Sequence, residues 1–223
     1  MERIDDLQVN GLKLIQDSDL FCFGCDAVEL ANFVEGAFAT KVCDLGCGSG
    51  IIPVLLAGKR GMRVTGVELQ EACVSLARRS VELNNLSDKI EIVCARMQDY
   101  AEDRNNIGAF DVVTSNPPYR KVGSGFKQEK DSVALARHEI AVTLKEVVHC
   151  ASRLVKSGGK FYTVCHIERL AEMISLCVSE KLEPKTLQIL RPCDGKPPHL
   201  FLLKCIKDAS PALTVLPERS LTA

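Results

Sequence analysis

The sequence predicts an α/β protein in which a mostly parallel sheet carries helices on both faces. From Lys41 onward, short runs of apolar and β-branched residues alternate with segments whose apolar residues recur at helical spacing. Parallel strands joined by helices are buried on both faces, so they appear as continuous apolar runs. Three chemically distinctive stretches directly follow such runs, at the strand ends where ligands bind in these sheets: residues 46–50, Glu68 and residues 116–119.

The expected elements follow one another along most of the chain. Seven strands are expected in the main sheet, at residues 41–45, 63–67, 90–94, 110–115, 160–164, 185–190 and 199–206. Helices are expected at residues 26–34, 51–59, 70–84, 132–153 and 167–180. Asp26 is the expected N-cap of the first helix, because its side chain can accept a hydrogen bond from the first turn. A small strand at residues 12–16 and a turn at residues 157–159 complete the prediction.

The domain organisation predicted from length and pattern is simple. The 223 residues fit one large domain, which we place at residues 1–208 with a short N-terminal extension at 1–38. Residues 209–223 carry Pro211, Pro217 and little pattern, so we expect a flexible tail there.

Charge and hydrophobic runs restrict the class of protein. The net charge of −1 does not mark a general nucleic-acid binder, so any basic surface must be local. No apolar run reaches the ~18 residues of a membrane span, and residues 1–6 lack the pattern of a signal peptide. We expect a cytoplasmic protein with no membrane partner.

The eleven cysteines are expected to be free thiols, because their number is odd and no export signal precedes them. Cys22 and Cys25 form a C-x-x-C pair, and Cys43 and Cys47 follow it. Zinc needs four tetrahedral ligands, but Cys43 falls inside an apolar strand and Cys47 inside a glycine loop. We therefore expect no metal site.

The glycine loop favours S-adenosylmethionine over a dinucleotide. Gly46, Gly48 and Gly50 form G-x-G-x-G, whereas a dinucleotide fingerprint needs a further glycine at the position of Ile51. Asp44 precedes the loop and suits a ligand that carries an ammonium or sulfonium group. Glu68 ends the next strand, where a carboxylate can accept hydrogen bonds from both hydroxyls of a ribose. An NAD enzyme is disfavoured by this spacing.

The segment Asn116-Pro117-Pro118-Tyr119 is the candidate acceptor site. Proline holds the preceding residue out of the helical region, so Asn116 is expected in an extended conformation at a strand end. The Asn116 amide oxygen and the Pro117 carbonyl can both accept hydrogen bonds from one planar NH2 group. Tyr119 can lie flat against a conjugated ring. These groups suit a substrate whose reacting atom is an amide or aryl-amine nitrogen.

Together these motifs resemble the class I methyltransferases that use S-adenosylmethionine, whose fold is Rossmann-like. More narrowly, the chain is similar to the bacterial tRNA adenine-N6 methyltransferase family that modifies valine tRNA beside its anticodon. Six segments carry this resemblance in order: residues 21–28, 44–50, 66–68, 116–119, 136–139 and 157–159. The segment at 116–119 alone is shared with DNA adenine methyltransferases and with methyltransferases of protein glutamine.

The resemblance implies roles for the cofactor residues. The loop glycines would line the methionine part of S-adenosylmethionine, with Asp44 near its amino group and Glu68 on its ribose. The family often has an acidic residue after the third strand that contacts the adenine of the cofactor, and Arg96 stands there instead. Met97 is expected to pack on that ring, with Asp99 as the nearest carboxylate.

The resemblance also implies a tRNA substrate. Asn116 and Pro117 would bind the exocyclic amine of an adenine, and Tyr119 would stack on the base. Substrate-binding candidates just after the strand are Pro118, Arg120, Lys121 and Arg137. Two other readings stay open: methylation of a protein glutamine amide, and a noncatalytic module that only binds cofactor or RNA.

Overall fold

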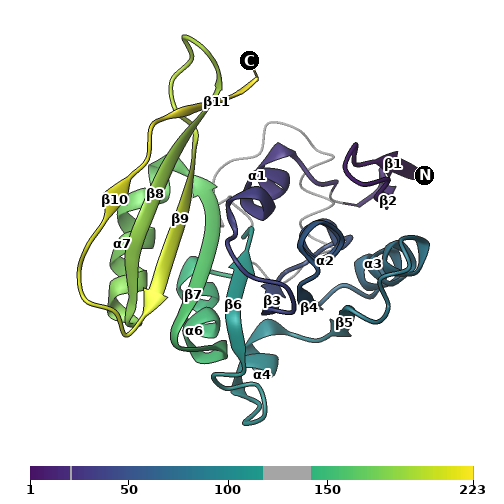
Figure 1. Ribbon diagram of the computed structural model, residues 1–223, viewed down its shortest axis with the longest axis horizontal. Helices are drawn as coiled ribbons and strands as arrows, with labels where there is room; N and C mark the ends of the chain where they lie inside the picture. Colours follow the sequence, from purple (N-terminus) through teal and green to yellow (C-terminus); the bar gives the residue numbers. More distant parts are fainter. Residues whose placement is uncertain (21, 118–141, 223) are drawn as a thin grey trace.

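The computed structural model describes residues 1–20, 22–117 and 142–222, and its centre is a nine-stranded sheet (Figure 1). Eight of the strands follow one another in the order β10-β8-β9-β7-β6-β3-β4-β5, and β11 pairs with β8 beside β10. Their bounds are β3 Lys41–Leu45, β4 Arg63–Glu68, β5 Ile90–Cys94, β6 Phe110–Ser115, β7 Val155–His166, β8 Leu182–Cys193, β9 Leu200–Lys207, β10 Thr214–Val215 and β11 Arg219–Thr222.

The seven expected strands are all present, and the fold class is confirmed. The adjacent strands β7, β6, β3, β4 and β5 are parallel to one another. Strand β9 is antiparallel to both β7 and β8. Two further strands, β10 and β11, come from the segment expected to be a flexible tail, and both pair in parallel with β8. The sheet therefore has nine strands rather than seven, while the boundary of the domain at residue 208 stays a prediction.

Alternation along the strands divides the apolar residues between the two faces of the sheet. Val112 packs with α1, α2 and α3, whereas its neighbour Val113 packs with α4 and α6. The helices on the first face are α1 Cys25–Phe33, α2 Ile51–Arg60 and α3 Glu71–Leu83. Those on the second face are α4 Met97–Glu102, α6 Leu144–Leu154 and α7 Leu170–Ser179, the last preceded by the short 3-10 helix η1 Ile167–Arg169. Of these, α4 is not expected from the sequence.

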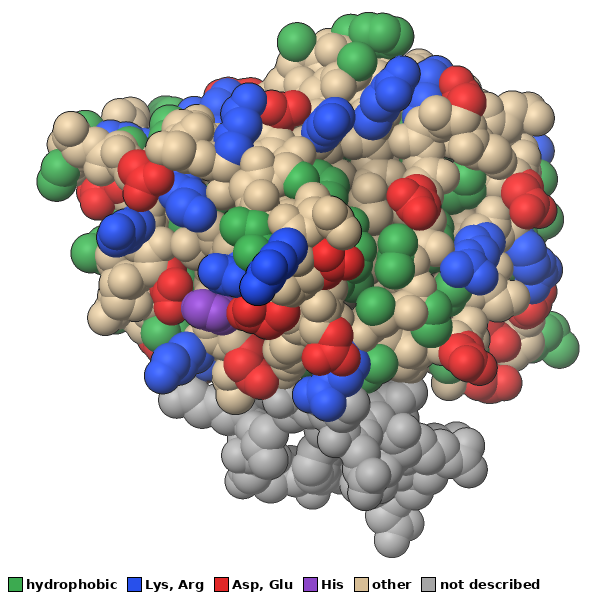
Figure 2. All heavy atoms as spheres, turned by 90° about the horizontal axis from the view of Figure 1, so that it is seen from below, with side chains coloured by type: hydrophobic (Ala, Val, Ile, Leu, Met, Phe, Trp, Pro, Cys, Tyr) green, Lys and Arg blue, Asp and Glu red, His purple; other side chains and the backbone are tan. Residues whose placement is uncertain are grey.

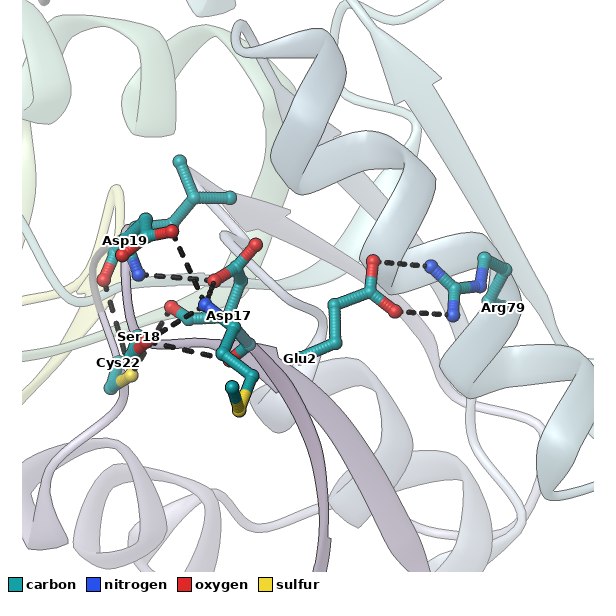
Figure 3. Close-up of polar contacts among 8 residues, drawn as sticks. Glu2, Asp17, Ser18, Asp19, Cys22 and Arg79 are labelled. Atoms are coloured by element: carbon teal, nitrogen blue, oxygen red, sulfur yellow. Dashed lines mark hydrogen bonds and ion pairs between the residues drawn. The ribbon is translucent and has the colours of Figure 1, made fainter.

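The N-terminal extension forms an antiparallel hairpin of β1 (Glu2–Asp6) and β2 (Lys13–Asp17) that lies against α3. The Ile15 backbone N–H donates to Ser80 Oγ at 3.0 Å, and Arg79 pairs with both carboxylate oxygens of Glu2 (Figure 3). Leu14, on β2, is fully buried in the core of the first face. The extension is therefore packed against the domain, because its apolar side chains complete that core.

Three local predictions need correction. The N-cap of α1 is Gly24 rather than Asp26, which lies inside the first turn, where other groups hold its side chain. Residues 157–159 are an irregular stretch within β7 rather than a turn before it, because β7 already pairs with β6 at Val155. For the helix expected at 132–153, α6 begins at Leu144, and residues 118–141 lie outside the described part of the chain.

The topology brings three strand ends together. Strands β6, β3 and β4 are consecutive in the sheet and parallel, so their carboxyl ends lie at the same edge. The glycine loop follows β3, Glu68 ends β4, and Asn116 follows β6. Among the described residues, no helix is long and apolar enough to span a membrane.

Candidate active site

The glycine loop leaves open space beside its backbone. Gly46 and Gly48 have positive φ angles of 75° and 55°. Among the described residues, a Cβ on Gly48 would meet nothing within 4 Å, and one on Gly46 would meet only Met97 Cε, at 3.9 Å. The loop is held against β4, since the backbone N–H groups of Gly46 and Cys47 both donate to the Val67 carbonyl. A ligand can therefore approach this backbone closely.

Gly50 has a different role from the other two loop glycines. It is the N-cap of α2 with a φ of 89°, and a Cβ there would lie 3.2 Å from Ala77 Cβ on α3. Its lack of a side chain thus allows α2 and α3 to pack closely. The expectation that Gly50 lines the cofactor stays a prediction.

Asp44 is a buried acid, and one of its oxygens has no hydrogen-bond partner among the described residues. Its side chain is 1% exposed, and Oδ1 accepts a 2.6 Å hydrogen bond from Thr114 Oγ1, its register partner on β6. Within the described residues, no donor reaches Oδ2. Burial raises the pKa of Asp44 to about 7, the charge of Glu68 adds to this rise, and the Thr114 hydrogen bond opposes it. A cationic group at Oδ2 would satisfy this oxygen and stabilise its charge.

Glu68 is oriented by backbone donors from two segments. Its Oε2 accepts from the Gly48 N–H at 3.0 Å and its Oε1 accepts from the Gln70 N–H at 2.9 Å. The side chain is 8% exposed. Each carboxylate oxygen can accept a second hydrogen bond, so the pair remains available for two vicinal hydroxyls.

Apolar side chains lie next to these acids. Met97 begins α4 and is half-buried beside the glycine loop, and Leu69 directly follows Glu68 with 40% of its surface exposed. Leu69 was not predicted as a site residue, although an apolar residue directly after the acidic strand end was an available signal in the sequence. Arg96 is the exposed N-cap of α4, and Asp99 is exposed in its first turn. We call Asp44, Gly46, Gly48 and Glu68 the cofactor side of the site.

The acceptor side of the site consists of Asn116, Pro117 and Asp26. Asn116 directly follows β6 and is half-buried, and Pro117 is buried. Asn116 Nδ2 donates to Asp26 Oδ2 at 3.1 Å, although 90 positions separate the two residues. Asp26 is 8% exposed and was missed as a site residue, because nothing in the sequence places α1 against the end of β6.

Five expected site residues lie outside the described part of the chain: Pro118, Tyr119, Arg120, Lys121 and Arg137. Their roles stay predictions. The other expected site residues are placed at the carboxyl edge of β3, β4 and β6 or at the start of α4.

The cysteines are free thiols, and several are buried. Cys47 is 4% exposed, and a Cβ on Gly66 would lie 2.8 Å from its Sγ, so a residue without a side chain is needed at position 66. Burial raises the pKa of the Cys47 thiol well above its usual range, which disfavours the thiolate that a metal would need. In residues 1–20, 22–117 and 142–222, no group of three or more His, Cys, Asp or Glu side chains is arranged to hold a metal ion.

A family model described as "Methyltransferase small domain" matches residues 27–176, from α1 to the penultimate turn of α7. The chain belongs to this family. The match includes the whole cofactor side of the site and, from the acceptor side, Asn116 and Pro117, whereas Asp26 lies directly before it. Membership implies a methyltransferase that uses S-adenosylmethionine.

Curated relatives have a narrower name. A protein of Yersinia pestis (strain Pestoides F) named tRNA1(Val) (adenine(37)-N6)-methyltransferase is 30% identical over 188 residues, covering 83% of this chain and 74% of its own. A protein with the same name from Yersinia pseudotuberculosis serotype O:1b is equally similar.

Solved structures resemble the same fold. A predicted O-methyltransferase from Agrobacterium tumefaciens has a TM-score of 0.68 and 25% identity, covering 87% of this chain and 85% of its own. Geranyl diphosphate C-methyltransferase from Streptomyces coelicolor, solved with S-adenosyl-L-homocysteine, has a TM-score of 0.62 at 16% identity over 82% and 78% of the two chains. At that identity the likeness supports the fold alone.

The chemistry of the site residues fits the chemical groups of S-adenosylmethionine. The unpaired Asp44 Oδ2 matches an ammonium group, and the open side of Gly46 and Gly48 provides space for a chain beside it. The Glu68 carboxylate can bind a diol, and Leu69 and Met97 provide apolar surface for a flat ring. Together these features match the charge and shape of the cofactor that the family uses.

Proposed function

We propose that this protein methylates the exocyclic amine of an adenine in tRNA, at the position next to the anticodon. The observation that carries this proposal is the placement of Asn116. It follows β6 two residues after Thr114, whose hydroxyl binds Asp44 on the cofactor side. A planar NH2 group held by Asn116 would therefore lie near the cofactor. The names of the Yersinia relatives support tRNA adenine as the source of that group.

The chemistry requires positioning more than a strong base. When bound, S-adenosylmethionine would supply a methyl group from its sulfonium, which becomes a neutral thioether. The amine nitrogen would accept the methyl group with its lone pair and lose one proton. The Asn116 amide oxygen and the Pro117 carbonyl would accept hydrogen bonds from the amine and hold its nitrogen. The lone pair of an aryl amine is delocalised into the ring, and these two acceptors would draw the nitrogen toward tetrahedral geometry. Rate would come from orientation and fixed dipoles.

An adenine must leave its stack to reach Asn116. An anticodon-loop base costs less to extrude than a paired base, which agrees with a substrate position beside the anticodon. Tyr119 is proposed to hold the extruded base by stacking.

The tRNA surface is proposed to be local and close to the acceptor side. Figure 2 shows the face at the bottom of Figure 1, where acidic and basic side chains are interspersed over the described elements. Such a mixed face does not favour a polyanion. Arg120, Lys121 and Arg137 are the proposed phosphate contacts.

Nucleoside mass spectrometry tests the proposal. Bulk tRNA that lacks the modification is incubated with the protein and S-adenosylmethionine and then digested. We expect N6-methyladenosine to increase with the wild-type protein and not with Asn116→Ala. If cofactor binds but no nucleoside is methylated, the proposal fails. Transfer of labelled methyl to protein glutamine would then identify the alternative acceptor, and no transfer at all would indicate a binding module.

A further inference from the structure

Asp26 makes a direct contact with the residue that is proposed to bind the substrate amine. The contact joins Asn116 Nδ2 to Asp26 Oδ2 at 3.1 Å, and the carboxylate is 8% exposed. Asp26 comes from the first turn of α1, whereas Asn116 follows β6. The contact therefore depends on tertiary packing and is not a local turn.

The chemistry of the two groups fixes how the amide is turned. An ionised carboxylate only accepts hydrogen bonds, whereas an asparagine amide has a donor end and an acceptor end. The NH2 end of Asn116 must therefore face Asp26, which leaves the Oδ1 end directed away from it. Resting on the proposed function, we propose that Asp26 is a positioning residue that holds the Asn116 amide with Oδ1 toward the substrate amine.

The fixed orientation matters because the opposite one would repel the substrate. With the amide turned over, two N–H groups would face the N–H groups of the adenine amine, and no hydrogen bond could form. The Asp26 carboxylate beside Nδ2 also polarises the Asn116 amide, which makes Oδ1 a stronger hydrogen-bond acceptor. Asp26 thus acts on the substrate amine only through Asn116.

The protein holds the Asp26 carboxylate by local and distant contacts. Its Oδ1 accepts a 2.9 Å hydrogen bond from the Ala27 N–H, and its Oδ2 accepts the one from Asn116 Nδ2. A Cβ on Gly24 would lie 2.8 Å from Asp26 Oδ1, so a residue without a side chain is required there for the observed rotamer. The need for glycine at this position comes from contact and not from backbone strain, because its φ of −105° is ordinary.

The segment before α1 is held by the N-terminal hairpin. The Phe23 backbone N–H donates at 3.0 Å to Oε1 of Gln16, a β2 residue that is 2% exposed and also contacts Asp5 on β1. Cys22 Sγ lies 3.5 Å from the Asp17 carbonyl, within the polar contacts drawn in Figure 3. The hairpin therefore stabilises the acceptor side of the site, because it holds the segment that leads into the first turn of α1, where Asp26 lies.

A double-mutant cycle tests whether Asp26 acts through Asn116. Single-turnover methylation of unmodified tRNA is measured for wild type, Asp26→Ala, Asn116→Ala and the double variant. We expect Asp26→Ala to lower the rate about 10- to 150-fold, the range for a hydrogen bond to a charged group, without changing cofactor affinity. In the Asn116→Ala background, the same change should have little further effect. An equal loss in both backgrounds, or no loss in the folded single variant, would overturn the proposal.

Two further variants separate positioning from folding. Gly24→Ala displaces the Asp26 side chain while keeping its charge, so it should lower the rate as Asp26→Ala does. Glu29→Gln is the matched control, because Glu29 is a mostly buried acid on the same helix that pairs with Arg219 instead. We expect this control to keep the wild-type rate. If Glu29→Gln loses activity as Asp26→Ala does, the effect is one of helix stability, and the proposal fails.

A readout without catalysis distinguishes failure of this proposal from failure of the proposed function. The Asn116 side-chain NH2 signal is identified in 15N-resolved NMR spectra by its loss in Asn116→Ala. We expect it to move in Asp26→Ala and Gly24→Ala but not in Glu29→Gln. A wild-type protein that methylates no adenine but shows this pattern would refute the proposed substrate and retain the positioning role. A signal indifferent to Asp26 would overturn that role even if tRNA is methylated.

Discussion

On the cofactor side of the site, the glycine loop and Glu68 come from neighbouring strand–loop–helix units, whereas the acceptor side joins residues 90 positions apart. Gly48 donates to Glu68 across only 20 positions, and β3 and β4 are adjacent strands. Asn116 instead depends on Asp26 from a helix that precedes the first strand of the main sheet. The contact between the glycine loop and Glu68 therefore depends on the geometry of two adjacent strands, whereas the contact between Asn116 and Asp26 depends on long-range packing. Substitutions on the two sides should therefore affect different measurements.

The largest expected effect is on the acceptor side. Asn116→Ala removes the proposed acceptor for the substrate amine and should lower kcat about 10²- to 10³-fold, as loss of one preorganised hydrogen-bonding group does. Cofactor affinity, measured by calorimetric titration, should be unchanged. Loss of cofactor binding together with activity would mean that the two sides are not separable at Asn116.

The corresponding change on the cofactor side is Asp44→Asn. It removes the charge opposite the proposed ammonium, and we expect cofactor affinity to fall about 10- to 150-fold. Thr114 can still bind the amide oxygen, so the fold should persist. Calorimetry gives the affinity and a thermal melt gives the fold. A folded variant with wild-type affinity would remove Asp44 from the cofactor site.

Asp44 should also make cofactor affinity depend on pH. Its pKa is raised to about 7 by burial, so the free protein holds a proton there below pH 7, and a cationic ligand favours the ionised form. Affinity should rise from pH 5.5 to 7 and level off above, with proton release seen in buffers of different ionisation enthalpy. Asp44→Asn should lack this rise. By the same linkage, the unfolding free energy that Asp44 contributes decreases as pH rises from about 4 to about 7.

Tyr119 lies outside the described residues, and its proposed role on the acceptor side can be tested by substitution. If it stacks on the extruded base, Tyr119→Ala should lower single-turnover methylation of tRNA about 5- to 150-fold, because stacking contributes ~1–3 kcal/mol per base. Tyr119→Phe keeps the ring and should retain most of the activity. Equal rates for Tyr119→Ala and wild type would remove the ring from the mechanism.

The smallest effects are expected at two glycines, Gly48 in the glycine loop and Gly66 on β4. Gly66→Ala places a Cβ 2.8 Å from Cys47 Sγ and 2.9 Å from Ile92 Cδ1, so it should cost ~1–3 kcal/mol of unfolding free energy. The Cβ of Gly48→Ala would meet no atom of the described residues, but Gly48 has a φ of 55°. The substitution should therefore cost ~1–2 kcal/mol of unfolding free energy and lower cofactor affinity more than Gly66→Ala does. Denaturant unfolding and cofactor titration on both variants check this. The reverse ranking in cofactor affinity would contradict the proposed open side of the loop.

The alternation of strands and helices could be predicted from the sequence, because apolar periodicity and turn residues are local signals. The sequence also located Asp44, the glycine loop, Glu68 and Asn116 at strand ends. Local chemistry could not show that Gly50 serves helix packing while Gly48 faces open space, since both have positive φ and the same loop pattern.

Which distant strands pair, and which distant side chains contact one another, could not be predicted from the sequence. β10 and β11 come from a weakly patterned tail, and they form because β8 offers an edge for pairing. Asp26 looked like a helix cap, a role that its own sequence neighbours suggested, but α1 lies where Asp26 reaches Asn116. The physical reason is the same in each case. Periodicity fixes which face of an element is buried, whereas the contacts between distant elements depend on how those faces pack in three dimensions.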